Sequence, residues 1–203
     1  MKLALFGGTF DPIHNAHLTI AREALERFGL DRILFITSAS PPHKSNAART
    51  PYEHRHRMVE LACQDEPRFI PSRIEEGTER SYSILTIEKI LPTLGPGDSL
   101  YFLIGADAFA EIETWYRADD VLRLIDFIVV SRPGHEYRIP PGARVHRLET
   151  LALPVSSSDI RSRLRSGHLP PDLPPAAAAY IREHGLYGIS STRHDSVTHD
   201  NVQ

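Results

Sequence analysis

Short apolar runs alternate along this chain with longer segments in which apolar residues recur at helical spacing. The first apolar run, 2–6, predicts a buried strand, and the segment 18–28 that follows predicts a helix that ends before Gly29. Further strands are predicted over 32–37, 68–71, 99–104, 126–130 and 145–148, and further helices over stretches that begin near 50, 79, 155 and 174. This alternation indicates the α/β class, with a doubly wound, mainly parallel sheet and a small C-terminal helical segment.

The length of the chain is enough for one domain with a real core. At 203 residues, we expect a single domain over 1–188, with helices of 155–188 packed on it. Residues 189–203 are polar and rich in Ser, Thr, His and Asp, so they are predicted to form a disordered tail.

The segment between the first strand and the first helix carries the strongest chemical signal. Gly7 and Gly8 let backbone N–H groups approach a ligand, and His14 and His17 follow where a helix N-terminus adds partial positive charge. A phosphate suits this arrangement. From the residues alone, an ordinary turn and a zinc half-site remain alternatives; no glutamate follows His14 as in the metalloprotease helix pattern, which disfavours zinc.

Composition and charge exclude several classes of protein. The hydrophobic content of 41% and charged content of 24% are typical of a soluble globular protein, and a net charge of −3 argues against a general nucleic-acid binder. The single cysteine, Cys63, is expected to be a core thiol in a reducing compartment. The N-terminal apolar run is too short for a signal peptide and no later run could span a bilayer, so we expect a cytoplasmic protein without a membrane partner.

Residues 7–12, GGTFDP, followed by His14 and His17, resemble the signature of the nucleotidyltransferase superfamily with the His-x-Gly-His motif. Within it, the chain is similar to the bacterial nicotinate-nucleotide adenylyltransferases as far as about Tyr187. The resemblance implies a Rossmann-like nucleotidyltransferase fold and transfer of the adenylyl group of ATP to nicotinate mononucleotide, with release of pyrophosphate. Ala16 stands where the family usually has Gly, and Leu85 stands where Asp is common.

Two other functions remain open at this point. One is transfer by the same fold to nicotinamide mononucleotide or to another phosphorylated acceptor. The other is a non-catalytic nucleotide-binding regulator, which the departures at Ala16 and Leu85 would motivate. If the chain transfers the adenylyl group to nicotinate mononucleotide, Mg²⁺ is expected to be held mainly by the substrate phosphates, because the sequence shows no cluster of carboxylates to hold it. No protein metal ligand is predicted.

The resemblance implies which residues bind ATP. The expected catalytic residues are His14, His17, Lys44 of a Pro-Pro-His-Lys loop, and Arg161. The serines at 156–158 and Arg161 also suit a second phosphate site on physical grounds. Without the resemblance, a well-capped helix with a surface arginine would be the favoured explanation. The ATP-binding set is expected to comprise Gly7, Gly8, Thr9, Phe10, His14, His17, Arg132, Ser156, Ser157, Ser158 and Arg161.

The acceptor site is expected to come from three segments. Arg80-Ser81-Tyr82-Ser83 resembles the family stretch that lines the nicotinate-nucleotide site. Asp107 follows a predicted strand end, where it can accept from ribose hydroxyls or cap the next helix, and Trp115 is either core or a stacking platform for the pyridine ring. The expected set is Lys44, Arg80, Tyr82, Ser83, Asp107, Trp115 and Tyr116.

The helix that begins at Thr50 carries four side chains that can be cationic. Thr50, Pro51 and Glu53 predict a capping box with Thr50 as N-cap. Residues 54–57, HRHR, are expected to form a solvated face or to serve local structure rather than catalysis.

Overall fold

The computed structural model describes residues 1–40, 50–152 and 154–190. In this part of the chain, six strands form one wholly parallel sheet in the order β3-β2-β1-β4-β5-β6. The strands are β1 (Lys2–Gly8), β2 (Arg32–Thr37), β3 (Phe69–Ser72), β4 (Ser99–Gly105), β5 (Asp126–Ser131) and β6 (Arg144–Glu149). The chain builds outward from β1 first on one side and then on the other, so the prediction of a doubly wound parallel sheet is confirmed.

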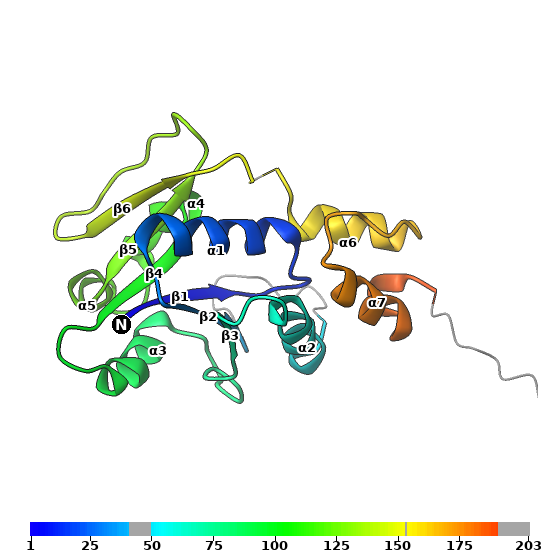
Figure 1. Ribbon diagram of the computed structural model, residues 1–203, viewed down its shortest axis with the longest axis horizontal. Coiled ribbons are helices and arrows are strands. Elements are labelled where there is room, and N and C mark those ends of the chain that lie inside the picture. Colours follow the sequence, from blue (N-terminus) through cyan, green and yellow to red (C-terminus); the bar gives the residue numbers. More distant parts are fainter. Residues whose placement is uncertain (41–49, 153, 191–203) are drawn as a thin grey trace, which may run out of the picture.

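Helices lie in the connections between successive strands from β1 to β5, whereas residues 132–143 join β5 to β6 without a helix (Figure 1). Parallel pairing requires crossover connections of about a dozen residues or more, and these are usually helical. The helices are α1 (Asn15–Phe28), α2 (Tyr52–Cys63), α3 (Ser83–Ile90), α4 (Ala106–Ala110), α5 (Ala118–Leu124), α6 (Ser157–Arg165) and α7 (Pro175–Glu183), with 3₁₀ turns η1 (Leu91–Thr93), η2 (Ile112–Thr114) and η3 (Leu186–Gly188). None of the helices in the described ranges is long and apolar enough to cross a bilayer.

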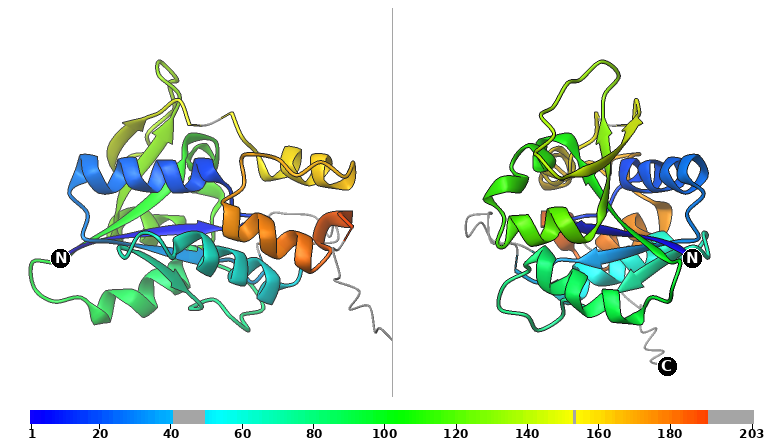
Figure 2. Two further views of the ribbon diagram at one scale, coloured as in Figure 1. Left: turned by 45° about the vertical axis from the view of Figure 1, so that its right-hand side comes forward. Right: turned by 90° about the vertical axis from the view of Figure 1, so that its left-hand side faces the viewer.

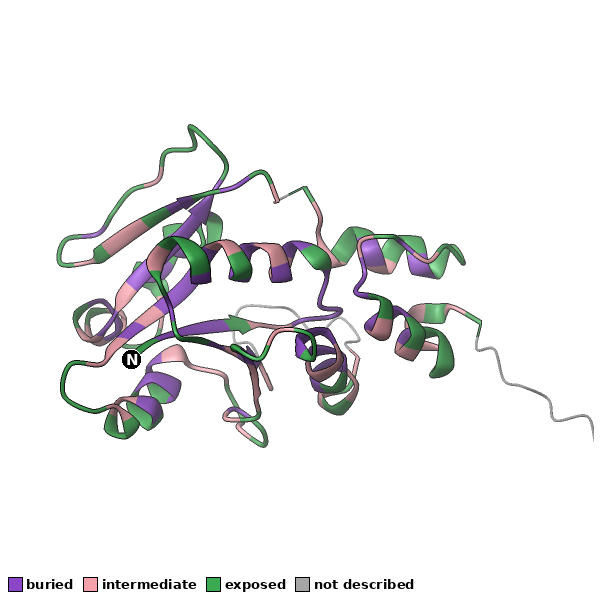
Figure 3. Cartoon of the chain, viewed as in Figure 1, coloured by how far each residue is buried: buried purple, intermediate pink, exposed green. Residues whose placement is uncertain are grey.

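Two apolar layers cover the two faces of the sheet. Along β1, Ala4 and Phe6 join the layer formed with α1, α2, α6 and α7, whereas Leu3 and Leu5 join the layer formed with α3, α4 and α5. The alternation follows from the pleat of the strand, which sends successive side chains to opposite faces. Buried residues accordingly run along the central strands in Figure 3. Burial on both faces explains why these strands read as nearly continuous apolar runs.

The two C-terminal helices pack at one end of the sheet, beside the end of β1 and the start of α1 (Figures 1 and 2). Ile160 and Leu164 of α6 and Ile181 of α7 are buried in the same layer as Phe6. This end of the sheet is where the carboxyl ends of the parallel strands lie, and in α/β proteins that is the usual place of a ligand site.

Some local predictions are wrong. The N-cap position of α2 is Pro51, without a side-chain capping bond, so Thr50 does not form the predicted capping box. α3 begins at Ser83, four residues after the start predicted near 79. α1 begins at Asn15, three residues before the start predicted at 18.

The prediction of a solvated face for residues 54–57 is wrong for Arg55 and His56, which are buried. The side chain of His56 lies beside the Thr37 hydroxyl, with Nδ1 and Oγ1 3.1 Å apart, and stacks on the Tyr52 ring. The alternative, a local structural role, describes both residues, because their polar groups are satisfied by neighbouring backbone and side chains.

Candidate active site

The loop between β1 and α1 turns back tightly onto the strand it leaves. A Cβ atom on Gly8 would lie 2.8 Å from the ring of Phe10, so only glycine fits there without displacing that ring. Phe10 itself has a positive φ of 47° and packs against Phe6 and Phe35. Its side chain is therefore part of the core, and the contact of Phe10 with ATP stays a prediction that concerns its backbone.

His14 and His17 stand together at the start of α1. The backbone N–H of His14 donates to Nδ1 of His17 over 3.2 Å, and the two rings stack with centroids 3.7 Å apart. Because Nδ1 of His17 accepts, the neutral ring carries its proton on Nε2, which is then a donor. Burial lowers the pKa of His14 to about 4, so this ring is neutral at pH 7.

The start of α6 lies against this loop. Arg161 donates from Nη1 to the carbonyl oxygen of Asp11 over 2.8 Å, and the Ser157 hydroxyl donates to the carbonyl oxygen of Pro12 over 2.9 Å. The structure thus brings Ser157 and Arg161 beside the loop that carries the two histidines, from a position far along the chain. Ser156 is the N-cap of α6, where its Oγ accepts from the backbone N–H of Asp159. Its contact with phosphate stays a prediction.

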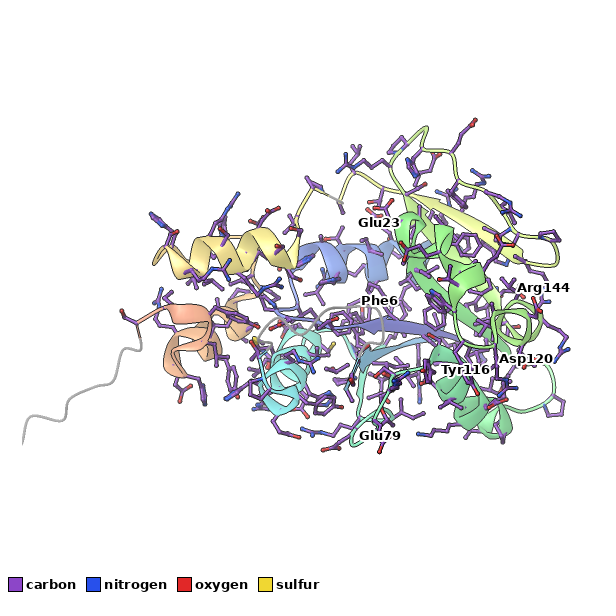
Figure 4. The ribbon with its side chains drawn as sticks, turned by 180° about the vertical axis from the view of Figure 1, so that it is seen from behind. Phe6, Glu23, Glu79, Tyr116, Asp120 and Arg144 are labelled. Atoms are coloured by element: carbon purple, nitrogen blue, oxygen red, sulfur yellow. The ribbon has the colours of Figure 1, made fainter. Side chains whose placement is uncertain are left out.

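A hollow of about 340 Å³ opens at the carboxyl ends of β1 and β4. Its walls include Gly7, Gly8 and Thr9 at the end of β1, and Trp115 with Tyr116 after η2. Trp115 is half-buried, with its ring 5.9 Å from that of Phe102 in an edge-to-face arrangement. Phe6 and Tyr116, which line this hollow, are labelled in Figure 4, where both lie nearer the middle of the view than Asp120 and Arg144.

The segment at the start of α3 also lines the hollow. Ser81, Tyr82 and Ser83 all line it, and the Tyr82 ring packs on that of Tyr116 at 4.6 Å between centroids. Arg80 is exposed and is not among the lining residues; its Nη1 donates to the Tyr82 hydroxyl over 2.9 Å. Arg80 therefore reaches the hollow only through Tyr82.

A second hollow, of about 360 Å³, lies between the ends of β4 and β5. Asp107 and Arg132 line it together with Ser131 and His135, and Gly105 borders both hollows. The sequence grouped Asp107 with Trp115 and Tyr116, but the structure brings it together with Arg132 instead. The reason is that Asp107 belongs to the first turn of α4, whereas Trp115 follows η2.

Comparison with known proteins identifies the family. The model of the cytidylyltransferase-like family matches residues 5–163. The chain is 62% identical over 187 residues to a protein of Solibacter usitatus named "Probable nicotinate-nucleotide adenylyltransferase", an alignment that covers 92% of this chain and 100% of that protein. A protein of the same name from Tropheryma whipplei (strain Twist) is 41% identical over 89% of this chain and 97% of its own. The chain belongs to the nicotinate-nucleotide adenylyltransferase family.

Membership of this family confirms the predicted enzyme class, a nucleotidyltransferase. A solved structure shares the fold: the Plasmodium falciparum nicotinic acid mononucleotide adenylyltransferase complexed with NaAD has a TM-score of 0.73 and 20% identity, covering 92% of this chain and 97% of that one. At that identity the likeness concerns the fold alone.

The remaining predicted site residues lie in different places. Gly7, Gly8, Thr9, Tyr82, Ser83, Trp115 and Tyr116 line the first hollow, and Ser158 is exposed on α6. Lys44 lies outside the described residues.

Two residues near these sites were not among the site residues predicted from the sequence. Arg55 donates to the carbonyl oxygens of Thr9 (2.7 Å) and Ser38 (2.9 Å), so it ties the glycine loop to the end of β2. Its spacing of three and four residues to the buried Met58 and Val59 was a signal that it lies on the buried face. Glu75, also buried, lines the first hollow and accepts from the Thr86 hydroxyl over 2.7 Å; it falls in a polar stretch without periodicity, which gave no signal.

Proposed function

We propose that this chain transfers the adenylyl group of ATP to nicotinate mononucleotide, giving nicotinate adenine dinucleotide and pyrophosphate, a step of NAD biosynthesis. The observation that carries this proposal is the loop between β1 and α1, which presents a stacked histidine pair beside the start of α6. The family membership of the chain and the names of its relatives support the choice of substrates.

The reaction needs no side-chain nucleophile. An oxygen of the acceptor 5′-phosphate attacks the α-phosphorus of ATP, the new P–O bond forms in line with the bond that breaks, and pyrophosphate leaves with that electron pair. Catalysis then rests on holding two polyanions together and on stabilising charge at the phosphates. We assign the donor Nε2–H of His17 to this stabilisation, with His14, Arg161 and Lys44 as further phosphate-binding residues.

The first hollow suits the pyridine nucleotide. We propose that Trp115 stacks on the pyridine ring and that Tyr82, Ser83 and Tyr116 surround its carboxylate, with Arg80 acting through Tyr82. Ser83 is the first residue of α3, and the N–H groups at a helix N-terminus favour an anion. A carboxylate offers acceptors only, so it fits this end better than a carboxamide, whose NH₂ group is a donor.

The ATP phosphates are proposed to lie over Gly7, Gly8 and Thr9, between the histidines and the start of α6 with Ser156, Ser157 and Ser158. The second hollow, with Arg132 and Asp107, is proposed for the nucleoside of ATP. Asp107, predicted from the sequence to bind the acceptor, is therefore proposed to bind ATP instead, since it shares its hollow with Arg132.

Mg²⁺ is proposed to be held mainly by the substrate phosphates, as this ion commonly is in phosphoryl transfer. In the described ranges, no three His, Cys, Asp or Glu side chains group closely enough to hold a metal ion. We further propose that residues 1–188 act as one domain and that the protein is cytoplasmic, for which the single buried cysteine, Cys63, is the support.

Pyrophosphate release tests the proposal directly. The purified protein is given ATP and Mg²⁺ with nicotinate mononucleotide, nicotinamide mononucleotide, phosphopantetheine, glycerol phosphate or no acceptor. We expect release with nicotinate mononucleotide. For nicotinamide mononucleotide we expect a kcat/KM about tenfold or more lower, because one hydrogen bond to a charged group contributes about 1.5–3 kcal/mol. Absence of release with both pyridine nucleotides would refute the proposal; equal kcat/KM for the two would refute only the preference.

A further inference from the structure

The last turn of the described chain reaches back to its beginning. The Tyr187 hydroxyl, in η3, donates to Oδ1 of Asp11 over 2.6 Å, across a sequence separation of 176 residues. Asp11 is only 5% exposed, and Tyr187 packs against the apolar layer that holds Phe6 and Ile160. Burial, together with the nearby Asp11 carboxylate, raises the pKa of Tyr187, so its hydroxyl keeps its proton throughout the physiological range.

Other residues of the loop between β1 and α1 are also held by residues of the C-terminal segment 157–187. The carbonyl oxygens of Asp11 and Pro12 accept from Arg161 and Ser157, and the backbone N–H of Asn15 donates to the carbonyl oxygen of Asp172 over 2.8 Å. The residues that lead into His14 therefore take their position from contacts with residues 157–187 rather than from the loop alone.

The backbone of Tyr187 shows that this contact is specific. Tyr187 has φ 59° and ψ 18°, in the left-handed region that a tyrosine seldom adopts, and it lies between Gly185 and Gly188, which also have positive φ. The chain thus bends sharply on both sides of Tyr187, and the ring is carried inward to the Asp11 carboxylate.

We propose that Tyr187 is a positioning residue for adenylyl transfer: by binding the Asp11 carboxylate it fixes the histidine pair relative to the start of α6. The proposal rests on the proposed function, in which both of those elements bind the phosphates of ATP. Tyr187 itself touches no reacting atom. Its effect arises because a displacement of about 1 Å in a group aligned for reaction can lower the rate by about 10²-fold.

A pair of tyrosines on neighbouring elements provides the test. Tyr187→Phe removes the hydroxyl that binds Asp11, and Tyr180→Phe, the control, removes a hydroxyl 2.8 Å from Nδ1 of His54 on α2. We expect Tyr187→Phe to lower kcat by about 10- to 100-fold with the KM of nicotinate mononucleotide within about twofold of wild type. Tyr180→Phe is expected to lower Tm without this loss of kcat. Equal effects of the two variants on kcat would overturn the proposal, as would an unchanged kcat in Tyr187→Phe.

A second comparison separates position from stability. Tyr187→Phe leaves the Asp11 carboxylate buried without the hydroxyl, which alone can lower Tm. Adding Asp11→Asn removes that charge, so the double variant is expected to regain Tm while its kcat stays low. Asp11→Asn alone keeps an oxygen that accepts from Tyr187, so its kcat is expected to stay within about threefold of wild type. Recovery of kcat in the double variant would show that buried charge, rather than position, caused the loss, and would overturn the proposal.

NMR signals of the histidine rings test the proposal without any acceptor substrate. The ring signals of His14 and His17 depend on their stacking, so we expect them to shift in Tyr187→Phe and to stay in place in Tyr180→Phe. Unshifted signals in Tyr187→Phe would count against the proposal even if the acceptor were not nicotinate mononucleotide. Failure of the wild-type protein to release pyrophosphate would, in contrast, refute the proposed function alone.

Discussion

His14 and His17 lie face to face, with ring centroids 3.7 Å apart and ring planes inclined by 23°. The two rings are not equivalent, because His14 is buried at 5% exposure whereas His17 is partly exposed. The backbone of His14 also fixes the tautomer of His17 by donating to its Nδ1. We therefore expect His17 to be the main phosphate donor, and His14 to be a further phosphate-binding residue that stays neutral at pH 7.

Replacing His17 should affect chemistry more than binding. If its Nε2–H stabilises charge in the transition state, His17→Ala should lower kcat by about 10²–10³-fold, as the loss of one preorganised donor typically does, and leave the acceptor KM nearly unchanged. Steady-state kinetics with both substrates varied measures this. The same substitution at the exposed His168 is the control and should leave both constants in place. A rise in KM with kcat retained would make His17 a binding residue.

The burial of His14 makes stability depend on pH. The unfolded chain protonates this ring near its ordinary pKa of 6.5, whereas the folded protein resists protonation until about pH 4. The unfolded state therefore binds more protons between these values, so the free energy of unfolding should fall as pH drops from 6.5 toward 4, by roughly 3 kcal/mol from this residue. The buried His56, whose pKa is also lowered by burial, adds to the fall in the same direction.

Urea unfolding at pH 7.5, 6 and 5 measures how steeply the free energy of unfolding falls with pH. In His14→Gln this fall should be smaller, since glutamine does not titrate in this range. A fall as steep as that of the wild-type protein would contradict the assignment of the effect to His14.

Trp115 should behave as a binding platform. Base–aromatic stacking contributes about 1–3 kcal/mol and is present in the ground and transition states alike, so Trp115→Ala should raise the acceptor KM by about 5- to 150-fold and leave kcat and the ATP KM largely unchanged. The chain has a single tryptophan, so quenching of its fluorescence by nicotinate mononucleotide reports binding without turnover. Thermal melts are needed as a control because Trp115 also contacts Phe102. An unchanged acceptor KM would identify Trp115 as core.

Gly8 should not tolerate even one methyl group. An alanine Cβ would stand 2.8 Å from the Phe10 ring, which Phe6 and Phe35 hold in place, so Gly8→Ala should destabilise the protein by about 1–3 kcal/mol. Gly7→Ala is the matched control, because its nearest contact would be an ordinary 3.7 Å from Phe102. Chemical denaturation measures both variants. Adding Phe10→Leu to Gly8→Ala should recover part of the loss, and no recovery would mean that the clash is relieved elsewhere.

The elements of the fold follow from local patterns. β2 spans Arg32–Thr37 as predicted, because a strand buried on both faces appears as an unbroken apolar run. α1 ends where Gly29 adopts φ 60°, a conformation that glycine takes at little cost. The histidine pair was also evident, since His14 and His17 are close in sequence and share the start of one helix. Each of these features depends on residues within one or two turns of one another.

Contacts between distant segments were decided only by the tertiary structure. Arg55 is buried because the carbonyl oxygens of Thr9 and Ser38 converge on it, and a helical pattern around residue 55 does not show those acceptors. Asp107 shares a hollow with Arg132 because the ends of β4 and β5 lie side by side. The Tyr187 hydroxyl binds Asp11, which is 176 residues away in the sequence. A hydrogen bond needs both groups placed to within a few tenths of an ångström, and that placement arises only once the sheet and both of its helical layers have packed.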